Sequence, residues 1–279
     1  MTHHETFICP YCSHVQLTLV AKTILHICTV CKESVVITEQ KPTGYMFHDE
    51  MENILYRMKS NSVDLVCTDP PYGVRKDMGW DDKLHFIKQV NGWLKECIRV
   101  SKHAVIWFCA SKMMPYIFKD LPAGIFHRQL DWKKPKGTQF AGASHNNIWY
   151  AKEPILIFSK DMKKTTSYGK DMKFNYDYLE YDTIGKKVWG HKTSKPVPLM
   201  AKLIQHYSNE GELVLDPFGG GGPTAEACIK TNRRFIIIEK SPDDKLPYTN
   251  VDGDNPDHYG TILSRVDDII NQGDAFRRL

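Results

Sequence analysis

The chain has 279 residues, of which 42% are hydrophobic and 25% are charged. These proportions are ordinary for a soluble globular protein and exclude a chain that is disordered throughout. The formal net charge of +4 permits a nucleic-acid partner but does not by itself indicate one. The longest apolar run, residues 104–110, is too short to span a membrane, and the first five residues lack the features of a secretory signal. We therefore expect no membrane association.

Four cysteines near the N-terminus form two C-x-x-C pairs that are separated by fifteen residues. They are Cys9, Cys12, Cys28 and Cys31. This spacing is typical of a site in which four thiolates bind Zn²⁺, and such a closed tetrahedral site is structural rather than catalytic. With short strands expected at 15–20 and 35–37, residues 1–40 are predicted to form a zinc ribbon that the metal stabilises. The alternative, four unrelated core cysteines, is disfavoured by the doubled spacing.

The other cysteines occur singly in apolar stretches, where free cysteine packs as a small hydrophobic side chain. They are Cys67, Cys97, Cys109 and Cys228. This usage favours a reducing, intracellular location, which would be the cytoplasm for a bacterial or viral protein.

Residues 41–279 are predicted to form one α/β domain, because apolar strands alternate with amphipathic helices. The expected strands are 63–67, 104–108, 155–158, 213–215 and 235–238. The expected helices are 51–58, 87–98, 199–207, 224–230 and 262–270. Strands that are apolar throughout indicate a mostly parallel sheet covered by helices on both faces. Ligands of such sheets bind beyond the carboxyl ends of the strands.

A basic, aromatic segment interrupts this alternation. Residues 133–195 contain thirteen lysines against six acidic residues, and the rest of the chain is net negative. Lysines interleaved with aromatic residues suit contacts with phosphates and bases. A solvated surface insertion is the alternative. We predict that residues 137–190 recognise nucleic acid, with Gln139, Asn146 and Asn147 as candidates for reading base edges.

Two strand ends carry unusual residues. Asp69-Pro70-Pro71-Tyr72 directly follows the strand 63–67. The prolines lack amide donors, so carbonyl oxygens stay free to accept beside a carboxylate and an aromatic ring. This combination suits a planar aromatic amine, whose hydrogens the Asp69 carboxylate and the Pro70 carbonyl could accept. A simple proline turn is the alternative.

The second unusual strand end is Asp216-Pro217-Phe218, followed by four glycines, between a strand and a helix. Glycine there lets a ligand approach the backbone closely. Glu239 ends the next strand, 23 residues after Asp216, and an acid at about this distance binds ribose hydroxyls in nucleotide-binding folds. These features favour an adenosine-containing cofactor, although a tight turn would also explain the glycines.

Taken in order, these motifs resemble the amino-methylating DNA methyltransferases that use S-adenosylmethionine, specifically the circularly permuted beta group. The matching segments are Asp69-Pro70-Pro71-Tyr72 for the catalytic motif, His191-Lys192-Thr193-Ser194-Lys195-Pro196 for H-x-T-x-K-P, and Asp216-Pro217-Phe218 with Gly220 and Gly222 for D-P-F-x-G-S-G-T. His48-Asp49 resembles the G-D before the catalytic motif, and Trp132-Lys133-Lys134-Pro135 with Glu153 resembles a later catalytic region. Gly221 and Pro223 depart from the pattern, because serine and threonine are usual there.

The resemblance implies a Rossmann-like methyltransferase fold and methyl transfer to the exocyclic amine of a base flipped out of double-stranded DNA. Asp69, Pro70, Pro71 and Tyr72 would be catalytic. The implied cofactor-binding residues are Asp49, Thr193, Lys195, Asp216, Pro217, Phe218, Gly220, Gly222 and Glu239.

Aspartate at the first motif position favours adenine N6 as the target, with cytosine N4 as the alternative. An RNA methyltransferase and an inactive zinc-ribbon binding protein are further alternatives. A role in restriction-modification and a homodimer are also expected from the resemblance.

Overall fold

The computed structural model describes residues 4–8, 15–19, 23–27, 34–38, 41–73, 83–138, 150–160, 176–184, 194–240 and 265–266. For residues 4–43, 136–138 and 150, only the backbone of these segments is described. No helix in the described part of the chain is long and apolar enough to cross a membrane.

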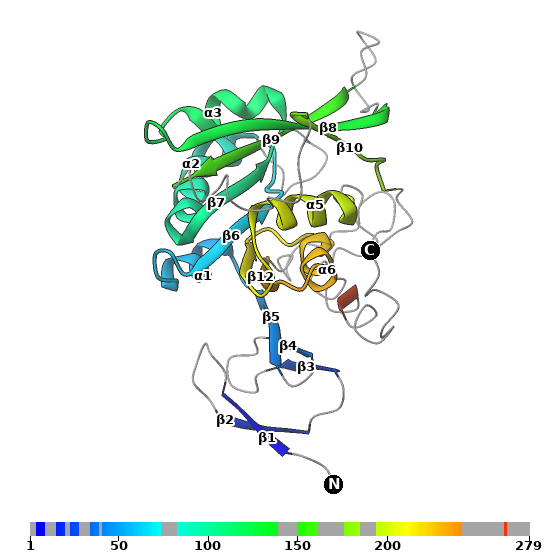
Figure 1. Ribbon diagram of the computed structural model, residues 1–279. Helices are drawn as coiled ribbons and strands as arrows, with labels where there is room; N and C mark the ends of the chain where they lie inside the picture. Colours follow the sequence, from blue (N-terminus) through cyan, green and yellow to red (C-terminus); the bar gives the residue numbers. More distant parts are fainter. Residues whose placement is uncertain are drawn as a thin grey trace, which may run out of the picture.

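A ten-stranded mixed sheet organises the protein (Figure 1). Its centre consists of five parallel strands, in the spatial order β7 (Ser101–Phe108), β6 (Val63–Thr68), β11 (Leu213–Asp216), β12 (Arg234–Glu239) and β5 (Lys41–His48). The side chains of β6 are buried throughout, as expected for a strand that is covered on both faces. The carboxyl ends of these five strands lie at one edge of the sheet.

Antiparallel strands extend the sheet on both sides. Next to β7 lie β9 (Tyr150–Ser159), β8 (Phe126–Thr138) and the short β10 (Tyr178–Glu180), which pairs parallel to β8. Next to β5 lie β4 (Ser34–Thr38) and β3 (Thr23–Ile27). The remaining strands, β1 (His4–Ile8) and β2 (Val15–Leu19), pair antiparallel in a separate two-stranded sheet.

Helices cover both faces of the parallel strands. One face packs against α1 (Met51–Arg57), α2 (Lys83–Val100) and α3 (Met114–Phe118), which follows a 3₁₀ turn, η2 (Ser111–Met113). The other face packs against α5 (Val197–Tyr207) and α6 (Pro223–Lys230). Each face has its own hydrophobic core, so the sheet separates two apolar layers.

The predicted architecture is confirmed, with a mostly parallel central sheet and helices on both faces. The strands and helices expected between residues 51 and 239 are all present, within a few residues of their predicted bounds. The structure adds β1, β3, β5, β8, β10 and α3, which the sequence did not predict. Of the expected helix 262–270, the structure describes only 265–266, and both of these residues are buried.

The N-terminal region is described only as strands, and Cys9, Cys12, Cys28 and Cys31 lie outside the described residues. The strands expected at 15–20 and 35–37 are present as β2 and β4. Because β4 pairs with β5, the backbone of the predicted ribbon continues into the main sheet. The remaining cysteines are free and buried, as predicted.

Candidate active site at the carboxyl ends of the parallel strands

Four acidic residues stand at the carboxyl ends of neighbouring parallel strands. Asp49 and Asp69 follow β5 and β6, while Asp216 and Glu239 are the last residues of β11 and β12. The parallel pairing brings all four to the same edge of the sheet. Sequence positions that span 190 residues therefore meet in one acceptor-rich region, where ligands of open α/β sheets bind.

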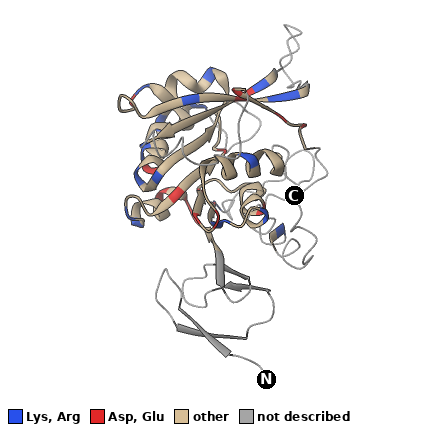
Figure 2. Ribbon diagram, viewed as in Figure 1, with Lys and Arg blue, Asp and Glu red and all other residues tan. Residues whose placement is uncertain are grey.

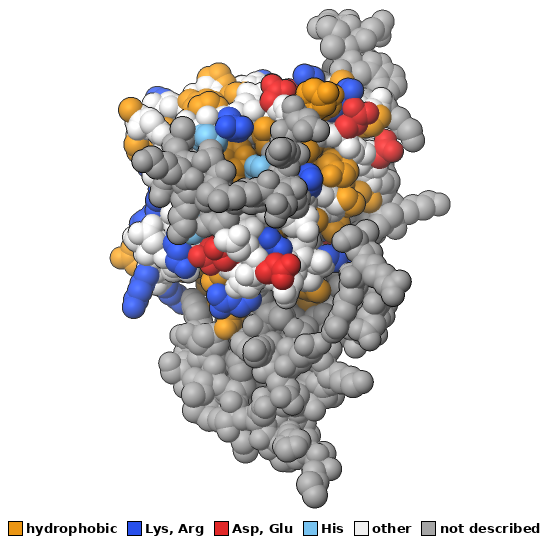
Figure 3. Space-filling model, in the orientation of Figure 1, with side chains coloured by type: hydrophobic (Ala, Val, Ile, Leu, Met, Phe, Trp, Pro, Cys, Tyr) orange, Lys and Arg blue, Asp and Glu red, His pale blue; other side chains and the backbone are white. Residues whose placement is uncertain are grey.

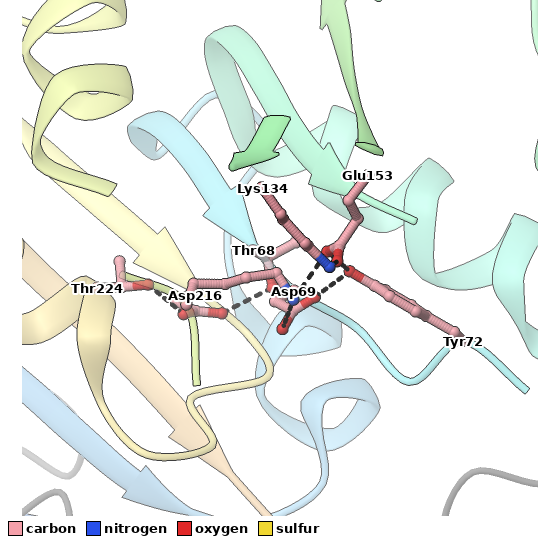
Figure 4. Close-up of polar contacts among 8 residues, drawn as sticks. Thr68, Asp69, Tyr72, Lys134, Glu153, Asp216 and Thr224 are labelled. Carbon is pink, nitrogen blue, oxygen red and sulfur yellow. Dashed lines mark hydrogen bonds and ion pairs between the residues drawn. The ribbon is translucent and has the colours of Figure 1, made fainter. Parts of the chain in front are cut away.

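Asp69 is the centre of a hydrogen-bonded cluster (Figure 4). Its Oδ1 lies 2.5 Å from the Tyr72 hydroxyl, and its Oδ2 lies 2.5 Å from Nζ of Lys195. Glu153, from β9, joins the cluster through Oε1, which is 2.8 Å from the Tyr72 hydroxyl and 3.0 Å from Nζ of Lys195. Lys134, from β8, closes it with Nζ 2.8 Å from Glu153 Oε2. Two carboxylates and two ammonium groups are thus combined, and their formal charges cancel.

Burial makes this charge balance necessary. The side chains of Lys195 and Lys134 are 4% and 7% exposed, and that of Glu153 is 12% exposed. Burial raises the pKa of Glu153, but the ammonium groups of Lys195 and Lys134 outweigh it and lower this pKa to about 2. Burial keeps the pKa of Asp69 above its ordinary value, with the Glu153 charge adding to the rise and Lys195 opposing it. Asp69 is therefore the more basic carboxylate of the two.

Tyr72 is held between these carboxylates. Its phenol carries one hydrogen, which the two acceptors must share. Burial raises the pKa of Tyr72 well above its ordinary value, and both carboxylates add to this rise, so the phenol stays neutral. Lys195 Nζ also lies 5.2 Å from the centre of the Tyr72 ring. Pro70 is buried and Pro71 is half-buried, and neither brings an amide hydrogen into the site.

Asp216 joins the two motifs. Its Oδ1 accepts hydrogen bonds from the Thr68 hydroxyl, at 2.6 Å, and from the amide of Phe218, at 3.1 Å. Its Oδ2 accepts from the Thr224 hydroxyl at 2.5 Å (Figure 4). Burial raises the pKa of Asp216 to about 7, although these hydrogen bonds oppose the rise. Asp216 fixes the end of β6 and the start of α6 around the glycine loop, and Pro217 after it is buried.

The glycine loop requires its glycines. Gly220 and Gly222 have φ angles of 51° and 75°, in the left-handed region that favours glycine. The amide of Gly220 donates to Oε2 of Glu239 over 2.7 Å, which connects the loop to the end of β12. Burial raises the pKa of Glu239 to about 7, with the Gly220 hydrogen bond opposing the rise and the Asp216 charge adding to it. Phe218 lies edge-on to Trp93, with ring centres 5.1 Å apart.

The other residues that the resemblance assigned to cofactor binding are Asp49, Lys195 and Thr193. Asp49 accepts hydrogen bonds from the amide of Glu50 and the side chain of Asn53, at the start of α1. Lys195 contacts the carboxylates of Asp69 and Glu153, whereas the resemblance counted it among the cofactor-binding residues. Beside it, the Ser194 hydroxyl is buried and has no hydrogen-bond partner among the described residues. Thr193 lies outside the described residues.

Sequence reasoning assigned no role to Thr68 or Thr224, the hydroxyl donors to Asp216. A threonine at the last position of a strand and another at the start of a helix are unremarkable alone. Only the adjacency of β6 and β11 reveals their common acceptor. Lys134 belongs to the W-x-K-P segment, but its contact with Glu153 depends on the pairing of β8 with β9.

Comparisons with known proteins agree with this geometry. A family model described as DNA methylase matches residues 63–245. The type II methyltransferase M.HpaI of Haemophilus parainfluenzae is 32% identical over 217 residues, which are 66% of each chain. The DNA adenine methyltransferase YhdJ of Escherichia coli K12 is 27% identical, over 70% of this chain and 77% of its own length. The chain spans 64% of another relative, the type II methyltransferase M.BglII of Bacillus subtilis, at 26% identity.

Solved structures share the fold. M1.HpyAVI in complex with SAM superposes with a TM-score of 0.56 at 23% identity, over 80% of this chain and 99% of that one. The PvuII cytosine-N4-specific DNA methyltransferase gives a TM-score of 0.57 at 15% identity, over 82% and 93% of the two chains. The family match includes the catalytic motif, the glycine loop and Glu239, which are the parts that the sheet brings together. The chain belongs to the N6/N4 DNA methylase family.

Proposed function

We propose that this protein transfers a methyl group from S-adenosylmethionine to the exocyclic N6 amine of adenine in double-stranded DNA. The observation that carries the proposal is the Asp69 carboxylate, which is held beside Tyr72 at the carboxyl end of β6 and paired with the ammonium group of Lys195. Asp216 and the glycine loop, on the adjacent strand β11, are connected to it through Thr68. Acceptor and cofactor loop therefore meet at one edge of the sheet.

The residues of this site suit the activation of an amine. The lone pair of an exocyclic amine is delocalised into the base, so hydrogen-bond acceptors that draw its nitrogen towards tetrahedral geometry make it nucleophilic. Asp69 Oδ1 and the Pro70 carbonyl are such acceptors, and the Tyr72 ring offers a face for stacking. The amine must displace the Tyr72 hydroxyl from Asp69 Oδ1. The alkylated nitrogen is strongly acidic, and Asp69, with its raised pKa, can take its proton.

The described residues fit S-adenosylmethionine. The cofactor supplies an electrophilic methyl group on a sulfonium. Glu239 offers a carboxylate for ribose hydroxyls, and Phe218 offers an aromatic ring next to the glycine loop. The buried Ser194 hydroxyl, without a partner among the described residues, is available for a polar end of the ligand. The mostly acidic edge suits a cation better than a nucleotide phosphate.

Adenine is favoured over cytosine by the aspartate at position 69 and by the relative YhdJ, which is named a DNA adenine methyltransferase. Several relatives carry type II names, which supports a role in restriction-modification.

Lysines and aromatic side chains on β8, on β9 and around β10 support a DNA substrate; in the free protein Lys133 and Lys152 are paired with Glu180 and Asp131. Tyr176, which is 66% exposed, stacks on Tyr178 with ring centres 5.4 Å apart. Lys133 Nζ lies 5.4 Å from the centre of the Tyr178 ring, and Lys152 is 60% exposed. Basic side chains recur along β8 in Figure 2, and basic, acidic and apolar side chains mix over this edge in Figure 3. Gln139, Asn146 and Asn147 lie outside the described residues.

We also propose a structural Zn²⁺ bound by Cys9, Cys12, Cys28 and Cys31. The positions of the strands support it, since each C-x-x-C pair falls in the connection of an antiparallel hairpin, the first between β1 and β2 and the second between β3 and β4. Elemental analysis of the purified chain should find one zinc per molecule, and its absence would remove this part of the proposal. A homodimer and an intracellular location complete the proposal.

Product analysis tests the function. Purified protein is incubated with S-adenosylmethionine and unmethylated genomic DNA, and the nucleosides are analysed by mass spectrometry. N6-methyladenine is expected from the wild type and not from Asp69→Ala, which should retain DNA binding. N4-methylcytosine as the product would agree with the family assignment but would show that the target base is cytosine rather than adenine. Methylation of RNA but not DNA would refute the proposal that DNA is the substrate. Failure to bind S-adenosylmethionine would refute the proposal that the protein is a methyltransferase.

A further inference from the structure

A fully buried arginine contacts the glycine loop from outside the matched region of the family model. Arg265 is 0% exposed, and its neighbour Val266, at 1%, belongs to the core on the face of α5 and α6. The family model ends at residue 245. Arginine is rarely buried unless its charge is paired, so this position demands specific partners.

The partners of Arg265 are the loop and the helix that follows it. Its Nη1 donates to the carbonyl oxygen of Gly221 over 2.5 Å. Its Nε and Nη2 each lie 2.6 Å from Oε2 of Glu226, in the first turn of α6. The other oxygen of Glu226 is 2.6 Å from Nζ of Lys230. The guanidinium thus bridges a loop carbonyl and a buried carboxylate, which is a strong, directional arrangement.

Arg265 and Glu239 hold two neighbouring residues of the glycine loop. Glu239 accepts from the amide of Gly220, and Arg265 donates to the carbonyl of Gly221. Two successive residues are therefore held by groups of opposite charge. A run of four glycines has more backbone freedom than any other sequence, so its geometry depends on such external contacts. Gly221 and Pro223 also lack the hydroxyls that relatives of this pattern carry, which leaves fewer local contacts.

We propose that Arg265 is a positioning residue for the cofactor, which acts by holding the Gly221 carbonyl so that the glycine loop is preformed for S-adenosylmethionine. The inference rests on the proposed function of the loop. It assigns a role in cofactor affinity to Arg265, and it predicts that Arg265 affects binding of the cofactor more than binding of DNA.

Calorimetric titration with S-adenosylmethionine tests the proposal on the full chain. The main variant is the double substitution Glu226→Gln with Arg265→Met, which removes both buried charges together and so avoids an unpaired carboxylate. Arg265→Lys is the conservative variant, and Val266→Ala is the matched control, because it weakens the packing of the same segment without touching the loop. Thermal unfolding and DNA binding are measured for each protein.

We expect the double variant to bind S-adenosylmethionine about tenfold more weakly, the loss typical of a hydrogen bond to a charged group, with DNA affinity within about twofold of the wild type. Arg265→Lys should recover part of the affinity, and Val266→Ala should lower the melting temperature with cofactor affinity retained. Equal cofactor affinity in the wild type and the double variant would overturn the inference. Equal losses in the double variant and Val266→Ala would reduce Arg265 to a packing role and also overturn it. Failure of the wild type to bind would instead refute the proposed function.

Discussion

Replacing Lys195 with methionine removes the ammonium group that both buried carboxylates of the active site contact. Methionine keeps the length and apolar body of the side chain, so the main change is the lost charge. Asp69 and Glu153 are then left close together, and among the described residues Lys134 is the remaining ammonium group in contact with the pair. Because Lys195 opposes the rise in the pKa of Asp69, its removal must raise that pKa further.

The size of the effect follows from the contact distances. Lys195 Nζ lies 2.5 Å from Asp69 Oδ2, and the pair is largely buried. Opposite unit charges about 4 Å apart interact by about 4 kcal/mol at an effective dielectric constant of about 20. Relaxation reduces this value, and an adjacent opposite charge typically lowers a carboxyl pKa by about one to three pH units. We therefore expect the pKa of Asp69 to rise by about two pH units.

The assay is the pH dependence of kcat for methyl transfer at saturating substrate. In the proposed function the ionised form of Asp69 accepts the amine hydrogens, so we expect activity to be lost as pH falls through the pKa of Asp69. A higher pKa moves the acid limb of the profile to higher pH. Lys134→Met is the matched control: it also removes a buried ammonium, but that ammonium contacts Glu153 and not Asp69. Both variants should lose about 3–5 kcal/mol of stability, because each leaves a buried charge uncompensated.

An acid limb that stays in place in Lys195→Met would refute the reasoning, since Lys195 would then have no electrostatic effect on Asp69. Equal displacement in Lys195→Met and Lys134→Met would also refute it. The effect would then belong to the total charge of the cluster rather than to the contact with Asp69.

Three further results are expected. Tyr72→Phe removes the hydroxyl that occupies Asp69 Oδ1 but keeps the ring, so its kcat should stay within about threefold of the wild type. Tyr72→Ala should lose about 1–3 kcal/mol of stacking with the base, and a loss of kcat in Tyr72→Phe larger than that in Tyr72→Ala would contradict this. Thr224→Val removes a buried hydrogen bond to Asp216, so it should lower the unfolding free energy by about 1.5–3 kcal/mol and weaken cofactor binding. Thr231→Val is the control, because the Thr231 hydroxyl donates to the helix backbone and not to Asp216, and this variant should keep its cofactor affinity. DNA binding should weaken steeply between about 50 and 200 mM salt, and a flat response measured by fluorescence anisotropy would exclude phosphate contacts by the lysines.

Much of the central fold was predictable because its strands are apolar throughout and are bounded by turns. The strand β6 and the helix α5 have clear patterns of this kind, and the structure confirms both. The strand β8 was missed because its lysines and Pro135 mask a period of two, in which Leu130, Trp132 and Lys134 are buried in alternation. A lysine at a core-facing position reads as a polar residue until its carboxylate partner is known.

The individual site residues were predictable to the extent that they stand in motifs. Asp69, Tyr72 and Glu239 follow apolar strands, so their common edge could be inferred from the parallel order. The contact of Lys195 with Asp69 spans 126 positions, and the contact of Arg265 with Gly221 spans 44. No local pattern encodes such pairs, because they depend on which strands become neighbours.

The hydrogen bond between Thr68 and Asp216 joins residues that are 148 positions apart. During synthesis on a ribosome, β6 emerges long before β11, its partner in the sheet. Until then the acidic end of β6 lacks Asp216 and the glycine loop, and Lys195 itself is synthesised 126 positions after Asp69. A nascent or truncated chain that lacks β11 therefore has Asp69 and Thr68 without the partners that hold them in the folded protein. Such long-range pairing also slows folding, so these contacts should form only after β6 has paired with β11.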